Sequence, residues 1–179
     1  MNDKTITIDD IDLLVFDFDG VLTDNLVYTD QNGNETVSCS RADGLAFDVL
    51  RAMSMKVFIL STETNPVVAR RAQKLCVPCL QSIGCKAEAL RELSVEHQFS
   101  LGHTLFVGND LNDLAAMDLC GYRACPADAH PVVRSHAHVV TGAVGGNGVV
   151  RELVEEHLGI DMDKALRKGA CGEEGRECL

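Results

Sequence analysis

Residues 11–24, with the sequence IDLLVFDFDGVLTD, constrain this chain more than any other segment. The apolar run 13–16 predicts a strand that is buried on both faces, as strands of a parallel sheet are. Asp17 and Asp19 follow at the end of that strand, and Gly20 permits a tight turn. Because ligands of open α/β sheets bind beyond the carboxyl ends of the strands, we expect these two acids at a ligand site.

Two carboxylates this close repel each other unless a cation lies between them. Mg²⁺ is the natural candidate, since it prefers oxygen ligands. One of the carboxylates could then act as a nucleophile that forms an aspartyl-phosphate. The alternative interpretation of Asp17 and Asp19 is a strand end followed by a solvated Asp-Gly turn.

Length and charge restrict the class of protein. The chain has 179 residues, of which 46% are hydrophobic and 24% charged, enough for one domain with a core. Its net charge of −11 argues against nucleic acid as a partner, and an anionic substrate would need local Arg or Lys. No apolar stretch approaches the roughly 20 residues of a membrane span, and the acidic N-terminus lacks a signal-peptide core. We therefore expect a cytoplasmic protein without membrane contact.

A hairpin and a series of strand–helix units follow the first strand. Asn32-Gly33 between β-forming residues predicts a hairpin flap over about residues 26–40. The alternation beyond it indicates an α/β fold: a three-layer, Rossmann-like parallel sheet with a small β-hairpin flap instead of a cap domain. The predicted strands are 56–60, 77–80, 104–107, 122–125 and 138–140, and the predicted helices are 42–53, 66–75, 86–97 and 149–158. We expect one domain over residues 1–160 and a flexible tail over 161–179.

Polar side chains stand near the ends of several predicted strands. They are Asp17 and Asp19, Ser61, Lys86, and the group Asn109, Asp110 and Asp113. Together they suit phosphoryl transfer, in which a metal ion neutralises phosphate oxygens, a hydroxyl donates a hydrogen bond and a lysine stabilises developing negative charge. Taken singly, Ser61 could cap a helix, Lys86 could be a surface charge, and Asp113 could favour a helix N-terminus.

The order acid pair, hydroxyl, lysine, acid cluster resembles the four motifs of the haloacid dehalogenase superfamily of phosphohydrolases. The resemblance implies that Asp17 attacks phosphorus and that Asp19 is the general acid and base, with its backbone carbonyl on Mg²⁺. It also implies that Ser61 and Lys86 are the second and third motifs. Residues 108–113, GNDLND, are then the fourth.

The fourth motif departs from the family pattern at one position. Asp usually follows the glycine and binds the metal, whereas this chain has Asn109, whose amide oxygen brings no charge. The candidate metal ligands are Asp17, Asp19, Asn109 and Asp110, with Asp113 supporting them from behind. We expect weakened metal affinity as a consequence.

Further segments narrow the resemblance to one branch of the superfamily. The hairpin flap, Asp43-Gly44, PADAHP at 126–131 and GGNGVVRE at 145–152 resemble phosphatases of eight- and nine-carbon 2-keto-3-deoxy sugar acids. Members of this branch are typically tetramers in which one subunit walls its neighbour's site. The resemblance covers roughly residues 9–159 and implies a Mg²⁺-dependent sugar-acid phosphatase that assembles as a homotetramer.

Residues that follow Ser61 bear on the choice of sugar acid. Thr62 and Glu63 lie at the edge of the expected site, and Arg71 and Lys74 share one face of the next predicted helix. Nonulosonate 9-phosphate phosphatases resemble this chain better than octulosonate 8-phosphate phosphatases, which tend to carry Arg where this chain has Glu63. A carboxylate there accepts hydrogen bonds from sugar hydroxyls, and the two cations pair with the substrate carboxylate. The alternative is a solvated helix face.

Two other functions stay open. The chain also resembles the phosphatase-like domain fused to some acylneuraminate cytidylyltransferases, which suggests a non-catalytic oligomerisation module, and Asn109 favours that alternative. A phosphatase of broader specificity is the third possibility. The CVPC sequence, Cys76 to Cys79, indicates half of a zinc site, a redox pair, or simply small buried thiols.

Overall fold

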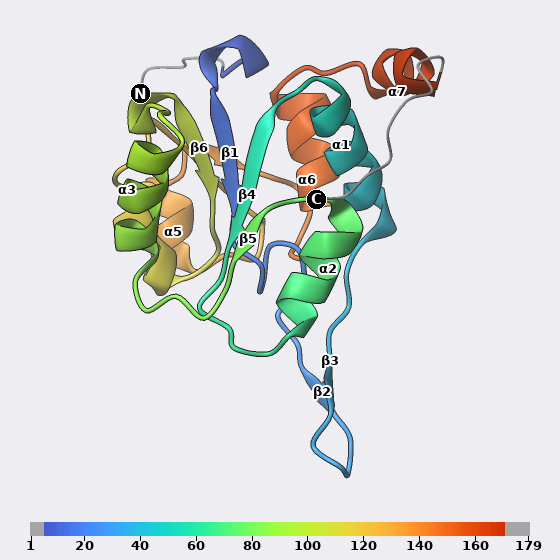
Figure 1. Cartoon of the computed structure of the whole chain (residues 1–179), viewed down its shortest axis with the longest axis vertical. Coiled ribbons are helices and arrows are strands. Elements are labelled where there is room, and N and C mark those ends of the chain that lie inside the picture. Colours follow the sequence, from blue (N-terminus) through green and yellow to red (C-terminus); the bar gives the residue numbers. More distant parts are fainter. Residues whose placement is uncertain (1–5, 171–179) are drawn as a thin grey trace.

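The computed structural model describes residues 6–170 of the chain. Its centre is a six-stranded parallel sheet with the strand order β5-β4-β1-β6-β7-β8 (Figure 1). The strands are β1 Leu13–Phe16, β4 Lys56–Leu60, β5 Cys79–Leu80, β6 Thr104–Val107, β7 Tyr122–Cys125 and β8 Val139–Val140. The helices are α1 Arg41–Ala52, α2 Val67–Leu75, α3 Lys86–Glu96, α4 Leu114–Met117, α5 Pro131–His136, α6 Val149–Glu152 and α7 Met162–Ala170. The predicted α/β parallel-sheet architecture is confirmed.

Strand β1 lies between β4 and β6 and is covered on both faces. Leu14 and Phe16 belong to the core that α1, α2 and α6 complete, whereas Leu13 and Val15 belong to the core completed by α3, α4 and α5. Figure 1 shows α1, α2 and α6 on one side of the sheet and α3 and α5 on the other. All four strand residues are fully buried, which explains why the run is apolar without alternation.

The register of the sheet brings the polar strand ends to one edge. Phe16, the last residue of β1, pairs with Ile59 of β4 and Val107 of β6. The next residue, Asp17, donates its N–H to the Val107 carbonyl at 2.9 Å. The residues that follow β1, β4 and β6 therefore meet at the carboxyl edge of the sheet, where a ligand site was expected.

The predicted hairpin is present between β1 and α1. Strands β2 Tyr28–Thr29 and β3 Glu35–Thr36 pair in antiparallel fashion, and the hairpin projects away from the body of the molecule (Figure 1). Asn65, in the loop after β4, connects the hairpin to the domain by donating from Nδ2 to Glu35 Oε2 at 2.9 Å.

The end of the chain differs from its prediction. The expectation of a flexible tail from residue 161 is wrong for residues 162–170, which form α7. Met162 is buried, and Ala165 and Leu166 pack against the same core as α1 because their spacing places them on one helix face. The remainder of the expected tail, residues 171–179, lies outside the described residues. Within the described part of the chain, no helix is long and apolar enough to cross a membrane.

Candidate active site

Lys86, the first residue of α3, is buried between two carboxylates. Its Nζ lies 2.6 Å from Asp17 Oδ1 and 2.6 Å from Asp113 Oδ1, and the lysine is only 3% exposed. Burial alone would lower the pKa of Lys86, but the charges of Asp17 and Asp113 raise it above its usual value. The lysine is therefore a fixed cation at the carboxyl edge of the sheet, and the alternative of a solvated surface charge is wrong.

Asp17 is buried directly after β1, and its Oδ1 is in contact with both a backbone N–H and the Lys86 ammonium. The Phe18 N–H donates to Oδ1 at 2.7 Å, and Lys86 lies at that atom too. Burial, with the nearby charge of Asp113, raises the pKa of Asp17 to about 7, although Lys86 opposes the rise. The carboxyl is thus poised between its neutral and ionised forms near neutral pH.

Asp19 and Glu63 face the same space from different loops. Asp19 is half-buried, and burial together with the charge of Glu63 raises its pKa. Glu63 is held by the backbone N–H groups of Asn65 at 2.8 Å and Thr64 at 2.6 Å, and these hydrogen bonds lower its pKa. Glu63 therefore adds a stable negative charge beside Asp19, as its sequence position predicts.

Ser61 lies directly after β4 and is buried. Its Oγ accepts the Glu63 N–H at 3.1 Å. A hydroxyl that accepts one hydrogen bond keeps its own proton for donation, so Ser61 is able to donate to a phosphate oxygen. Thr62, the next residue, is exposed.

The three polar residues of the loop after β6, Asn109, Asp110 and Asp113, differ in burial and in hydrogen-bond partners. Asp113 is fully buried, and its Oδ2 accepts the N–H groups of Asn109 at 2.9 Å and Asp110 at 3.2 Å. Asp110 is exposed and turns its carboxylate onto the Leu111 N–H at 2.7 Å. Asn109 is buried, and its Oδ1 has no hydrogen-bond partner among the described residues.

The donor set fits a hard cation. Asn109 offers an unpaired buried oxygen, and Asp17 and Asp19 offer carboxylates whose pKa values are raised by burial and, to a smaller extent, by the nearby charges of Asp113 and Glu63. In the described part of the chain, no group of three or more His, Cys, Asp or Glu side chains is arranged to hold a metal ion. A cation here would therefore depend on amide or carbonyl oxygens beside the two carboxylates, which Mg²⁺ accepts and softer metals do not favour.

The two cations predicted to bind the substrate, Arg71 and Lys74, lie in α2. Arg71 is half-buried and donates from Nη2 to the carbonyl oxygen of Ser40, the N-cap of α1, at 2.8 Å. Lys74 is exposed. The structure thus gives Arg71 a structural contact that the sequence analysis did not predict.

Thr23 is a site residue to which the sequence analysis gave no role. It is fully buried, and its Oγ1 accepts the N–H groups of Gly20 at 3.1 Å and Asn25 at 3.3 Å. It also hydrogen-bonds with Asp19, which lowers the pKa of that carboxyl. The available signal was a hydroxyl residue four positions after Asp19, at a distance that one tight turn can close.

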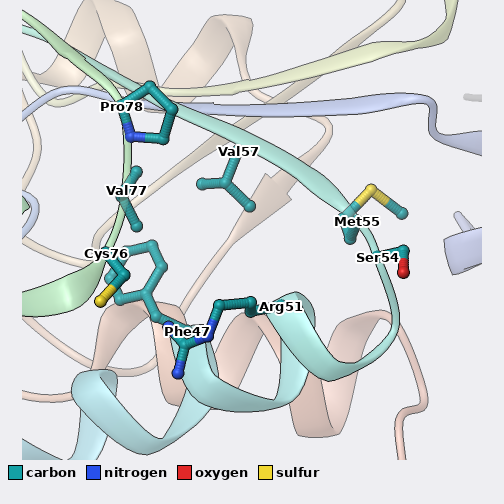
Figure 2. Close-up of a pocket in the computed structure, with 8 residues that line it drawn as sticks. All are labelled: Phe47, Arg51, Ser54, Met55, Val57, Cys76, Val77 and Pro78. Carbon is teal, nitrogen blue, oxygen red and sulfur yellow. The ribbon is translucent and has the colours of Figure 1, made fainter. Parts of the chain in front are cut away.

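A pocket of about 170 Å³ that does not belong to this site lies between α1, the start of β4 and the segment before β5. Phe47, Val57 and Pro78 are among the residues that line it (Figure 2). Ligand pockets usually measure about 300–1,000 Å³. The adjoining Cys79 is a free thiol whose pKa burial raises to about 11, so a redox role for it is not favoured.

The chain is similar to a known family of hydrolases and to individual characterised proteins. Residues 71–153 match the family model of haloacid dehalogenase-like hydrolases. The chain is 33% identical over 163 residues to the 3-deoxy-D-manno-octulosonate 8-phosphate phosphatase KdsC of Yersinia pestis, covering 90% of this chain and 86% of that protein. It is 29% identical over 150 residues to the N-acylneuraminate cytidylyltransferase A of Danio rerio. That match covers 82% of this chain but only 34% of the longer protein.

Solved structures are similar over nearly the whole domain. A structure from Streptomyces avermitilis, assigned to the HAD hydrolase family, has 45% identity and a TM-score of 0.85, covering 88% of this chain and 91% of that chain. The 3-deoxy-D-manno-octulosonate 8-phosphate phosphatase from Moraxella catarrhalis, solved with magnesium, phosphate and KDO, has 28% identity and a TM-score of 0.79. It covers 90% of this chain and 91% of that chain.

The raised pKa of Asp17 predicts how stability depends on pH in chelator-treated protein. The folded carboxyl keeps its proton up to about pH 7, whereas the unfolded one loses it near its usual value of 3.8. The folded state therefore binds more protons in this window, and the free energy of unfolding should fall as pH rises from about 4 to 7, by at most about 1.4 kcal/mol per pH unit. Urea denaturation at several pH values measures this. The fall should be smaller in Asp17→Asn, and an identical pH dependence in both proteins would contradict the burial argument.

Proposed function

Because the chain belongs to the haloacid dehalogenase-like hydrolases and is a phosphoric monoester hydrolase, we propose that it dephosphorylates a 2-keto-3-deoxy sugar acid with the help of Mg²⁺. The observation that carries the proposal is the buried contact of Lys86 with Asp17 and Asp113. A scaffold protein gains little net stability from burying an ammonium and two carboxylates, because their desolvation is costly. A phosphoryl-transfer site needs this arrangement.

In the proposed mechanism Asp17 is the nucleophile. The contacts with Lys86 and the Phe18 N–H both fall on Oδ1, so attack on phosphorus would come from Oδ2 and give an aspartyl-phosphate. Asp19, whose pKa is raised by burial and by the charge of Glu63, protonates the leaving alkoxide and then takes a proton from the water that hydrolyses the intermediate. Ser61 donates to a phosphate oxygen, and Lys86 stabilises the negative charge that develops there.

The proposed metal ligands are Asp17, the backbone carbonyl of Asp19 and Asn109 Oδ1. When bound, Mg²⁺ would neutralise phosphate oxygens and orient the phosphoryl group for attack. Asn109 is preferred to Asp110 because its buried oxygen has no described partner, whereas the Asp110 carboxylate is engaged with the Leu111 N–H. The relative from Moraxella catarrhalis, solved with magnesium, supports the choice of ion.

The proposed substrate is a nonulosonate 9-phosphate, with an octulosonate 8-phosphate next. The sugar-acid class rests on the similarity to octulosonate 8-phosphate phosphatases over most of the chain. Glu63 supports the nine-carbon acid, because its carboxylate lies near Asp19 and has a low pKa, so it is ready to accept hydrogen bonds from sugar hydroxyls. The similarity to an N-acylneuraminate cytidylyltransferase points in the same direction.

Phosphate release from a substrate panel tests this function. The panel holds octulosonate 8-phosphate, two nonulosonate 9-phosphates and common hexose phosphates, each with Mg²⁺ and with chelator. We expect chelator-sensitive turnover that is greatest for a nine-carbon acid, and loss of at least about 1,000-fold in Asp17→Asn, because an amide cannot act as the nucleophile.

The outcomes of the panel separate the alternatives. Full activity of a folded Asp17→Asn would overturn the mechanism, and an octulosonate preference would overturn the role given to Glu63. Absence of turnover on every substrate by the folded wild type would instead favour the non-catalytic oligomerisation module.

Asn109 gives a separate prediction about the metal. Asn109→Asp adds a charged ligand, so we expect Mg²⁺ to bind about 10-fold or more tightly in calorimetry without substrate. Asp110→Asn is the matched control, because that exposed carboxylate faces a backbone N–H, and its Mg²⁺ affinity should stay near that of the wild type. Equal effects of the two substitutions would contradict the choice of Asn109 as ligand.

We propose further that the protein is a homotetramer assembled through its hairpin. Three consecutive apolar residues of the flap segment, Leu26, Val27 and Tyr28, are 55–57% exposed, and exposed apolar clusters of this kind mark interaction sites. Sedimentation equilibrium should give four chains for the wild type and fewer for Leu26→Glu, since a buried charge opposes association. Val95→Glu, at another exposed apolar residue, is the control. A monomeric wild type would contradict the proposed tetramer without affecting the proposed phosphatase mechanism.

A further inference from the structure

The turn that follows Asp19 is compressed between two other segments. A Cβ added at Gly20 would lie 1.9 Å from Asn109 Nδ2, so the Asn109 amide rests directly on this turn. Gly20 also has a φ of +80°, and its N–H donates to Thr23 Oγ1 at 3.1 Å. No side chain other than hydrogen fits at this position. The position of the Asp17–Asp19 segment relative to Asn109 thus depends on where the turn rests.

A glycine loop meets the turn from another side. A Cβ added at Gly145 would lie 2.3 Å from the carbonyl oxygen of Gly20 and 2.8 Å from that of Thr23. A Cβ added at Gly146 would lie 2.4 Å from the backbone nitrogen of Asp24, and the Gly146 N–H donates to the Val21 carbonyl at 3.0 Å. Both glycines therefore form a backbone-to-backbone contact that no other residue type permits.

The loop is itself held by carboxylates from three parts of the chain. Asp128 Oδ1 accepts the Gly145 N–H at 2.9 Å. Glu152 accepts the N–H groups of Gly142 at 2.6 Å and Ala143 at 2.7 Å. Asp43, at the start of α1, accepts the Arg151 N–H at 2.9 Å just after the loop. Three separate anchors for one short loop indicate that its position, rather than its flexibility, matters.

We propose that Gly145 and Gly146 are positioning residues for the proposed phosphoryl-transfer site, acting within their own chain. Their backbone supports the turn from Gly20 to Asp24 and so sets Asp19 and its carbonyl against Asn109. This inference rests on the proposed function and adds a determinant of metal binding and of kcat that touches neither substrate nor metal.

Gly145→Ala tests the proposal without adding backbone strain, because Gly145 does not have a positive φ. The new methyl group would displace the turn by roughly 1 Å, and a misplacement of that size costs about 100-fold in rate. In the full-length protein, with p-nitrophenyl phosphate as the probe and temperatures well below melting, we expect kcat to fall about 10- to 100-fold. We expect KM to change less than about threefold and the Mg²⁺ concentration for half-maximal activity to rise.

Gly102→Ala is the matched control, since that glycine also lacks a positive φ and its added Cβ would meet only Ser100 Oγ at an ordinary 3.5 Å. It lies before β6, at the opposite end of the strand from the site, and should match the wild type in kcat and Mg²⁺ dependence. Equal kinetics of the two variants, with the wild type active, would overturn the inference and leave the proposed function standing. A folded wild type that turns over neither p-nitrophenyl phosphate nor any substrate of the sugar phosphate panel would overturn the proposed function instead.

Asp128→Ala decides the matter if Gly145→Ala does not fold. This change removes the acceptor of the Gly145 N–H without adding bulk, so we expect a smaller loss of kcat, about 3- to 10-fold, with a raised Mg²⁺ requirement. Asp128→Asn keeps a carbonyl acceptor and should recover most of the activity. If Asp128→Ala has wild-type kcat and Mg²⁺ dependence, the loop does not position the turn and the inference is overturned.

Discussion

The structure depends on one buried ion cluster, in which the Lys86 ammonium lies between the carboxylates of Asp17 and Asp113. Removing these groups from water is costly, and the cost is offset only when the three meet within hydrogen-bond distance. They come from the end of β1, the start of α3 and the turn after β6, so one cluster sets the relative positions of three strand–loop units. Burial, together with the charge of Asp113, raises the pKa of Asp17, and Lys86 partly opposes that rise.

Around this cluster, backbones approach one another where side chains would not fit. Gly20 lies under the Asn109 amide, and Gly145 lies against the Gly20 carbonyl. Asn65 donates its backbone N–H to Glu63 and its side-chain Nδ2 to Glu35 of the flap. The loop that carries the proposed sugar-recognition carboxylate is thereby connected to the hairpin.

Much of this arrangement can be predicted from the sequence, because it depends on patterns that extend over only a few residues. The apolar runs at 13–16, 57–60 and 105–107 predict strands buried on both faces, and the structure has strands over 13–16, 56–60 and 104–107 at the centre of its sheet. Parallel strands bring their carboxyl ends to one edge of the sheet, so the sequence alone predicts that polar residues following such runs lie close together. The sequence also shows that Asn109 stands where the family pattern usually has Asp, so one predicted metal ligand carries no charge.

The sequence by itself determined the central strands, the edge at which the polar residues gather and the chemistry they suit. Only the tertiary structure decided that Asn109 rather than Asp110 is buried, that Arg71 also binds the Ser40 carbonyl, and that Asp43 holds a backbone N–H 108 residues away. It also decided that residues 162–170 pack as α7. The physical reason is that periodicity and turn chemistry act over a few residues. The choice among partners distant in the chain is made by burial and by hydrogen bonds that exist only once the sheet has formed.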